Sequence, residues 1–273
     1  MDYLAYYQLD QEPFSVMPLT RFYYHSEQHD RAMMRLERAV AQMKGLALLI
    51  GDVGTGKTTL ARRLLDNLSE EEYEASLLVV VHADVEGGWL LKRIAMQLGV
   101  ENVPEDRIAA LGKLYERLGE IAESGRKAVV LIDEAQMLRQ PVLMEEIRGL
   151  LNLELPEQKL VTFVLFGLPE LDHNLQSDPP LAQRVAVRFR LEPFQEDTTA
   201  DYIHHRLALV GRTDPLFTAE ALAAVHHCAS GIPRLINVVC DNALFEGYVR
   251  GQAQIDSDII DSVVSDLGLQ SRL

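Results

Sequence analysis

Apolar residues along the chain follow two patterns, which are short uninterrupted runs and longer stretches with helical spacing. The runs, together with the segment near 185–191, predict five strands at 46–50, 77–82, 128–133, 161–166 and 185–191. Helical spacing predicts helices near 27–43, 88–98, 107–123 and 141–153, and a further helix that follows a glycine-rich turn and ends near 68. Short apolar strands that alternate with helices are typical of a parallel sheet covered on both faces.

The pattern changes after Pro193, where the predicted strands stop. Helical spacing continues near 197–210, 218–229, 234–249 and 256–266, with Asp197 or Thr198 as the N-cap candidate of the first helix and Thr218 as that of the second. We therefore expect three parts, which are an N-terminal aromatic segment and helix at 1–45, an α/β nucleotide-binding domain at 46–194, and a small all-helical lid domain at 195–273.

Composition narrows the class of protein. The 273 residues carry a formal net charge of −15 at pH 7, which disfavours generic coating of DNA because phosphate repels an acidic surface. The N-terminus lacks a basic segment followed by an apolar run, and each apolar run is too short to cross a bilayer, so we expect a cytoplasmic protein without a membrane span. The two cysteines, Cys228 and Cys240, lie on apolar helical faces and predict buried thiols.

The stretch GDVGTGKT at 51–58 fits the pattern G-x-x-x-x-G-K-[ST] of a phosphate-binding loop (P-loop), between a predicted strand and a predicted helix. Its glycines let backbone N–H groups turn around phosphate oxygens at the positive end of the helix. We expect Lys57 to contact the β- and γ-phosphates and the Thr58 hydroxyl to bind Mg²⁺. The predicted nucleotide contacts are Gly51, Asp52, Val53, Gly54, Thr55, Gly56, Lys57, Thr58 and Thr59.

A second motif, VVLIDEAQ at 129–136, ends the third predicted strand with two carboxylates. Ligands of open α/β sheets bind at the carboxyl ends of the strands. Asp133 is therefore predicted to hold Mg²⁺, directly or through water. Glu134 is predicted to orient or deprotonate the water that attacks the γ-phosphate.

Three arginines are candidates for contacts with the γ-phosphate. Gly231 and Pro233 hold Arg234 at the start of a helix in the lid, where it is either a nucleotide sensor or a surface residue. Arg184 precedes the fifth predicted strand and suits insertion into the site of a neighbouring subunit, with an intramolecular salt bridge as the alternative. Arg188 is the rival for insertion.

These motifs, in this order, resemble an AAA+ ATPase. The segments QEPFSVMP, GDVGTGKTT, LIDEAQML, EEIRGLLNLE, QRVAVRFRL and SGIPRLINVVCDNAL resemble the general secretion pathway protein A family over nearly the whole chain. That family includes ATPases of type II secretion, of MSHA-type pilus biogenesis, and of exopolysaccharide and exosortase loci. The resemblance implies a P-loop AAA+ fold with a five-stranded parallel sheet between helices and a helical lid.

The resemblance also implies function. We expect an enzyme that binds and hydrolyses ATP with Mg²⁺, the preference for ATP over GTP coming from the resemblance alone. Its nucleotide state would control assembly of a homo-oligomeric ring or filament and of a cell-envelope machine, which is type II secretion, an MSHA-like type IV pilus or polysaccharide export. A protein partner would then hold it at the inner membrane.

The sequence departs from the family at two points. It ends after the lid, as short ATPase-only members do, whereas secretion members continue into a membrane span and a periplasmic region. Leu168 stands in FGLPEL where the family has glutamine, near the end of the fourth predicted strand. Leucine cannot donate a hydrogen bond to position the attacking water, so we expect slow turnover.

Side chains near the site have two interpretations each. His82, at the end of the second predicted strand, either holds Glu134 inactive before assembly or is a solvent-facing strand end. The aromatic residues Phe14, Phe22, Tyr23 and Tyr24 either flank the adenine or pack in a core.

Two other functions remain open. The DEAQ and lid motifs are shared with AAA+ regulators of DNA transposition that load onto DNA, although no winged-helix segment follows the lid and the chain is acidic. A nucleotide-gated scaffold with negligible hydrolysis is the second alternative. Glu134 argues against a scaffold, because a pure switch does not need an acid that activates water.

Overall fold

The computed structural model describes residues 2–15, 17, 20–81, 87–156 and 158–269. The chain forms two compact units. The first, here the helical unit, comprises Met1–Ser26, Val53–Gly56 and Glu192–Leu273. The second, here the sheet unit, comprises Glu27–Asp52 and Lys57–Leu191.

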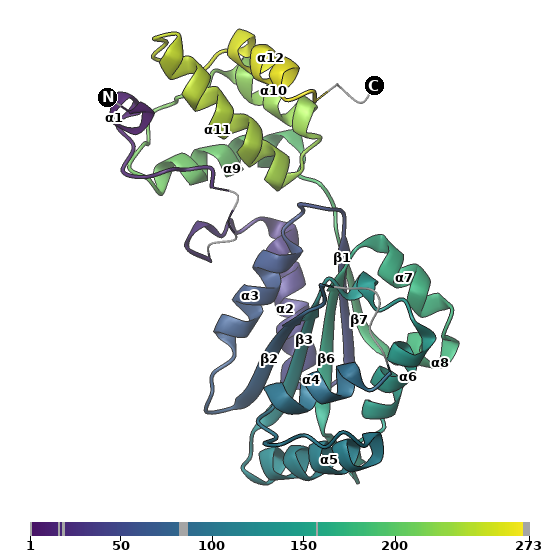
Figure 1. Cartoon of the computed structure of the whole chain (residues 1–273). Coiled ribbons are helices and arrows are strands. Elements are labelled where there is room, and N and C mark those ends of the chain that lie inside the picture. The colour runs from purple at the N-terminus through teal and green to yellow at the C-terminus, as the bar shows by residue number, and fades with distance from the viewer. Residues whose placement is uncertain (1, 16, 18–19, 82–86, 157, 270–273) are drawn as a thin grey trace. The chain divides into compact units, whose positions relative to one another are not determined.

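The sheet unit is built on a parallel sheet with the strand order β2-β3-β6-β1-β7 (Figure 1). Its strands are β1 (Leu46–Gly51), β2 (Tyr73–Val79), β3 (Lys127–Asp133), β6 (Val161–Gly167) and β7 (Val185–Leu191). The strands β3 and β6 are neighbours in parallel register, with Ile132 opposite Leu165. Parallel neighbours place their carboxyl ends at the same edge, so the turns after β3 and β6 lie side by side. The predicted five-stranded parallel sheet is confirmed.

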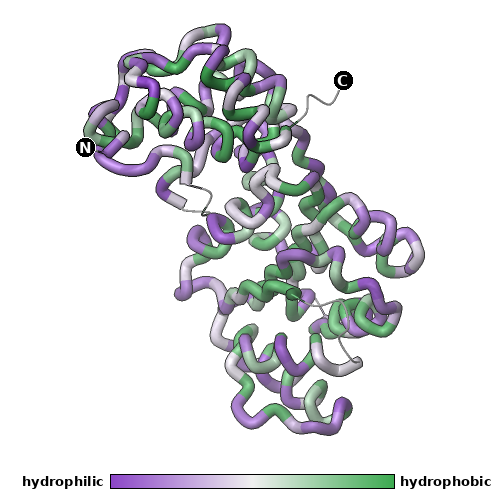
Figure 2. The backbone as a smooth tube through the Cα atoms, turned by 45° about the horizontal axis from the view of Figure 1, so that its top comes forward, coloured by the Kyte–Doolittle hydropathy of each residue, from purple (hydrophilic) through white to green (hydrophobic). Residues whose placement is uncertain are grey.

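Helices cover both faces of this sheet. They are α2 (Glu27–Ala41), α3 (Lys57–Asn67), α4 (Trp89–Gln97), α5 (Arg107–Glu123), α6 (Pro141–Leu150), α7 (Pro169–Gln176) and α8 (Pro179–Ala182). Leu46, Leu48 and Ile50 of β1 pack in one core with α4 to α8, and the alternate residues Ala47 and Leu49 are fully buried as well. Successive strand residues face opposite sides, so both sides are covered. Figure 2 shows hydrophobic and hydrophilic stretches following one another along the backbone.

The second strand begins earlier than predicted. The apolar run predicted a strand at 77–82, whereas β2 starts at Tyr73 and ends at Val79. The first three residues of β2 are all partly exposed, and buried positions appear only at Ser76 and Leu78, because β2 is an edge strand of the sheet. The first residues of β2 do not form an apolar run, so the apolar pattern does not indicate where this strand begins. The short antiparallel pair β4 (Glu154–Leu155) and β5 (Gln158–Lys159) was also not predicted.

The helical unit contains the four helices predicted after Pro193, namely α9 (Glu196–Ala208), α10 (Ala219–Ala229), α11 (Pro233–Val249) and α12 (Ser257–Asp266). Residues 2–15 contain α1 (Tyr3–Tyr7), which was not predicted, and pack with these helices. The Tyr7 hydroxyl donates to the Gln252 carbonyl oxygen at 3.0 Å, and Asp10 N donates to Val210 O at 3.0 Å. The expected 1–45 part is thus divided between the two units. Aromatic side chains of its first residues complete the core formed by the C-terminal helices.

Both cysteines are free thiols in the helical unit. Burial raises the pKa of Cys228 to about 11 and the pKa of Cys240 well above its ordinary value. Cys240 is buried as predicted, whereas Cys228 is partly buried at the edge of the core. Among the described residues, no helix has the length and apolar character needed to cross a bilayer.

Candidate functional site

The P-loop lysine lies at the junction of β1 and α3. Lys57 is the first residue of α3 and is 7% exposed. Its Nζ donates to the carbonyl oxygens of Gly51 at 2.9 Å and Asp52 at 2.8 Å. Both acceptors are neutral carbonyl groups, and the Lys57 charge also acts on the Asp133 carboxylate, whose pKa it lowers against the larger rise caused by burial. A buried cation at the start of a helix is suited to an anionic ligand.

The two residues predicted to bind Mg²⁺ lie in contact. The Thr58 hydroxyl donates to Asp133 Oδ2 at 2.7 Å, and Glu134 N donates to Asp133 Oδ1 at 2.9 Å. Asp133 is 2% exposed at the end of β3, and burial raises its pKa, although the Thr58 hydrogen bond and the Lys57 charge oppose that rise. A buried carboxylate paired with a hydroxyl is a set of hard oxygen donors that gains from a nearby cation. The residues present fit a magnesium ion.

The second carboxylate follows in an unusual backbone conformation. Glu134 has φ 56° and ψ 33°, in the left-handed region, and leads into the short 3₁₀ turn η2 (Ala135–Met137). Residues other than glycine are uncommon there and mark a local structure held by its surroundings. Its carboxylate Oε2 accepts a hydrogen bond of 2.6 Å from Gln136 Nε2. Gln136 is the last residue of the DEAQ segment, and the motif alone predicted no role for it.

The tip of the P-loop, Val53–Gly56, belongs to the helical unit by its contacts. Arg234 N donates to the carbonyl oxygen of Gly54 at 3.3 Å. A Cβ on Gly54 would lie 2.8 Å from the Arg234 Cβ and 2.9 Å from the Ile232 Cγ2, so only glycine allows this approach. The start of α11, with its exposed Arg234, is thus packed against the loop tip. Contact of its guanidinium with phosphate stays a prediction.

The structure assigns intramolecular partners to both rival arginines. Arg184 lies in the turn between α8 and β7, and its Nη1 donates to the Arg148 carbonyl oxygen at 3.1 Å. Arg188, on β7, forms an ion pair with Asp172 at 2.7 Å. The Arg184 bond is to a neutral carbonyl, which a competing anion could replace more readily than a salt bridge. Insertion of either arginine into a neighbouring subunit stays a prediction.

Leu168 follows β6 and is the N-cap residue of α7. Its side chain carries no hydrogen-bond donor, as the sequence indicated, but its backbone N–H donates to Gln136 Oε1 at 3.1 Å. The strand end after β6 is therefore linked to the Glu134 turn by a backbone group. His82, proposed as another partner of Glu134, lies outside the described residues.

The N-terminal aromatic residues lie in the core of the helical unit. Phe14 is 1% exposed and contacts Phe217 edge-on, with ring centres 6.1 Å apart. Tyr24 lies with its ring centre 5.6 Å from that of Tyr202. These contacts correspond to the packing interpretation.

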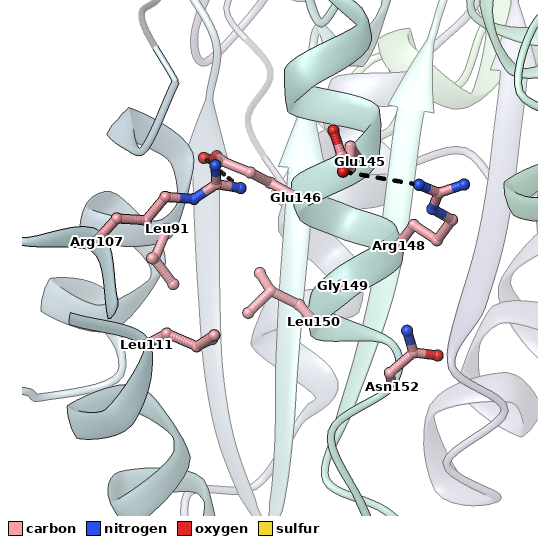
Figure 3. Close-up of a pocket in the computed structure, with 9 residues that line it drawn as sticks. All are labelled: Leu91, Arg107, Leu111, Glu145, Glu146, Arg148, Gly149, Leu150 and Asn152. Carbon is pink, nitrogen blue, oxygen red and sulfur yellow. Dashed lines mark ion pairs between the residues drawn. The ribbon is translucent and has the colours of Figure 1, made fainter. Parts of the chain in front are cut away.

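A pocket of about 300 Å³ in the sheet unit lies apart from these residues (Figure 3). It is lined by Leu91, Arg107, Leu111, Glu145, Glu146, Arg148, Gly149, Leu150 and Asn152. Arg107 and Glu146 form an ion pair at 3.6 Å across it. It contains neither P-loop residues nor the carboxylates after β3, so it is not the site predicted from the motifs.

Comparisons with known proteins agree with this geometry. The family model described as an AAA domain matches residues 40–175. General secretion pathway protein A of Aeromonas hydrophila is 36% identical over 260 residues, which cover 93% of this chain and 46% of that protein. The solved structure of ORC2 from Aeropyrum pernix has a TM-score of 0.68 at 19% identity, covering 94% of this chain and 72% of ORC2. Cdc6p from Pyrobaculum aerophilum has a TM-score of 0.69 at 18% identity, with coverages of 94% and 71%.

The chain has a P-loop on a five-stranded parallel sheet, followed by a helical region. These features define the class of protein, and the chain belongs to the AAA+ ATPases. Within that class, it is a relative of general secretion pathway protein A. The chain spans less than half of the length of that relative, at 46%. The solved structures, which are less than 20% identical, support the fold alone.

Proposed function

We propose that this protein binds Mg·ATP at the P-loop and hydrolyses it with Glu134 as the general base. The observation that carries this proposal is the 2.7 Å bond between Thr58 and the buried Asp133. It joins the two residue types that hold Mg²⁺ in P-loop ATPases, at the carboxyl edge of the sheet. The ORC2 structure was solved as ADPNP and ADP complexes, which agrees with a nucleotide ligand for this fold.

In this mechanism, Thr58 and Asp133 would hold Mg²⁺, which neutralises charge that develops on the phosphate oxygens. Lys57 and the loop N–H groups bind the β- and γ-phosphates. The Glu134 carboxylate orients the attacking water and accepts its proton. Hydrolysis is expected to be slow, because Leu168 provides no polar side chain near that water.

We propose further that Arg234 senses the bound nucleotide. It is exposed at the start of α11, and its backbone contacts the P-loop tip. A γ-phosphate attracts a guanidinium that ADP does not engage, so ATP favours one arrangement of the lid. That arrangement would favour a homo-oligomeric ring or filament in which Arg184, or its rival Arg188, completes a neighbour's site.

The relation to general secretion pathway protein A supports a role in a cell-envelope machine. The proposed machines are a type II secretion apparatus, an MSHA-like type IV pilus or a polysaccharide exporter. A protein partner would recognise the ATP-bound oligomer and hold it at the inner membrane. The 36% identity over 93% of this chain is the support for this step.

Light scattering and ATPase rates test the proposal together. We expect a larger assembly with ATP or a non-hydrolysable analogue than with ADP, and a specific activity that rises with protein concentration. Glu134→Gln should bind ATP, lose hydrolysis by roughly 10²- to 10⁴-fold and remain assembled. A constant specific activity would argue against a shared site. No heat on titration of Mg·ATP in a calorimeter would remove the proposal entirely.

Two measurements address the alternatives. ATPase activity equal in the wild type and Glu134→Gln would favour the nucleotide-gated scaffold. Nucleotide-dependent binding to duplex DNA that weakens with salt would favour the DNA regulator. The related ORC1 structure is a complex with DNA, but at 18% identity it supports the fold alone, and the net charge of −15 opposes this function.

A further inference from the structure

Gln136 carries a buried amide in the turn that follows Glu134. It lies in η2, two residues after Glu134, and is 2% exposed. A buried amide requires partners for its oxygen and its amino group, since an unpaired one costs free energy. Its amino group bonds Glu134, the proposed general base, and its oxygen bonds the backbone of Leu168.

The two partners fix the orientation of the amide. Leu168 N can only donate, and it lies 3.1 Å from Gln136 Oε1. The amino group must therefore face the other way, where Glu134 Oε2 accepts from it at 2.6 Å. The backbone at the end of β6 in this way determines which group Gln136 presents to the carboxylate.

The backbone geometry brings these groups together. The neighbouring strands β3 and β6 end at the same edge of the sheet. A Cβ on Gly167 would lie 2.8 Å from Leu171 Cδ2 and 3.1 Å from Gln136 Oε1, so glycine permits the close approach. Asn174 Nδ2 donates to the Gln136 carbonyl oxygen at 3.4 Å and contacts the same turn without involving Glu134.

We propose that Gln136 is a positioning residue for the Glu134 carboxylate, and this inference rests on the proposed ATP hydrolysis. Its side chain connects the Leu168 backbone N–H, at the end of β6, to the Glu134 carboxylate. The Leu168 side chain has no polar group and cannot make this connection. Gln136 bonds one carboxylate oxygen and leaves the other available to accept the proton of the attacking water. Its neutral amide adds no charge, so Glu134 keeps its function as a base.

Substitutions of Gln136 test this role by steady-state kinetics. Gln136→Met has a similar length but cannot donate or accept these bonds. We expect kcat to fall about 10- to 100-fold, the effect of one hydrogen bond to a charged group, with ATP affinity within about twofold of the wild type. Gln136→Glu keeps the shape and should lose similar activity, because it presents an acceptor to a carboxylate. Asn174→Ala is the matched control and should retain kcat.

A double-mutant cycle shows whether Gln136 acts through Glu134. In a Glu134→Gln background, adding Gln136→Met should change the residual rate by less than about twofold. A full loss in that background, or a kcat of Gln136→Met equal to or above that of the wild type, would overturn the inference while ATP hydrolysis stands. Should Gln136→Met not fold, Gln136→Leu, which also has no polar atom to bond Glu134, carries the same tests. A wild type without ATPase activity would remove the proposed function together with this inference.

Discussion

The sheet unit and the helical unit each bury an ionisable side chain, but in different surroundings. In the sheet unit, Lys57 contacts carbonyl groups five and six residues away in its own motif. In the helical unit, Arg206 is 4% exposed and donates to the carbonyl oxygens of Pro13 and Ser15, more than 190 residues away. It also donates to the Tyr202 hydroxyl at 3.1 Å and lies 4.3 Å from the centre of the Phe22 ring.

This difference teaches that burial of a charge does not by itself identify a site. Arg206 is held on several sides by neutral acceptors and aromatic rings, and burial lowers its pKa. Its contacts tie the N-terminal segment to α9. Lys57 and Asp133 lie instead at a helix start and a strand end, where ligands bind. The first arrangement stabilises the fold, and the second is available for a ligand.

The largest effect is expected at Lys57. Lys57→Met should weaken ATP binding by roughly 1000-fold, about 4 kcal/mol, because the phosphates lose a buried charge partner. Calorimetric titration of Mg·ATP measures this loss. Arg62→Met, an exposed position of the same helix, is the control and should bind normally. Equal losses in both variants would contradict a specific role for Lys57.

Arg206 should affect stability instead of chemistry. Arg206→Leu leaves two backbone carbonyls without their buried donors, so we expect a loss of about 3 kcal/mol in the free energy of unfolding of the helical unit. Urea unfolding and faster hydrogen exchange in residues 2–15 would report it. Arg250→Leu breaks a partly exposed pair with Glu246 and an exposed hydrogen bond to Ser262, and should cost less than about 1 kcal/mol. A stable Arg206→Leu protein would break the contrast between the units.

The predicted sensor Arg234 should change nucleotide discrimination. Arg234→Ala is expected to reduce the preference for ATP over ADP by about tenfold, since one charge-assisted contact to the γ-phosphate is lost. The stability of the helical unit should not change, because this side chain is exposed. Titrations with both nucleotides measure the ratio. An unchanged ratio would leave Arg234 as a surface residue.

Leu168 provides a smaller test in the sheet unit. Leu168→Gln adds a polar side chain at the end of β6, and we expect turnover to rise by about threefold. The gain is limited because Gln136 already contacts Glu134. Steady-state ATPase rates give the comparison, with ATP affinity as the control. An unchanged rate would count against the idea that Leu168 slows hydrolysis.

The smallest effect concerns pH and the helical unit. Burial, more than any other cause, lowers the pKa of His205 below its ordinary value of 6.5. The unfolded chain then binds more protons at this residue than the folded protein does, so its contribution to stability is present above pH 6.5 and is lost as pH falls toward the folded pKa. His205→Gln should flatten the pH dependence of unfolding there. His204→Gln, at an exposed neighbour, should not.

Local chemistry explains what sequence reasoning predicted well. The strands β1, β3 and β6 are built mainly from uninterrupted apolar residues. Such runs can be recognised in the sequence without knowledge of the neighbouring strands. The P-loop motif and the carboxylates after β3 are each contained in a few consecutive residues. Their contact through Thr58 and Asp133, 75 residues apart, followed from the rule that strand ends meet at one edge.

Contacts over long sequence separations explain what was missed. The link from Leu168 through Gln136 to Glu134 depends on β6 lying beside β3, and strand order is not contained in either segment. The bond between Arg184 and the Arg148 carbonyl likewise joins the turn before β7 to helix α6, and neither segment signals the other in the sequence.

The sequence by itself therefore determined the class, the alternation of strands and helices, and the residues predicted to bind phosphate and magnesium, because these depend on neighbours along the chain. Only the tertiary structure decided that residues 2–15 pack with the C-terminal helices, that Arg206 stabilises them, and that an amide spans the ends of β3 and β6. Each of these requires two distant surfaces to match in shape and hydrogen bonding. Such a match is a property of the folded chain and of no single segment.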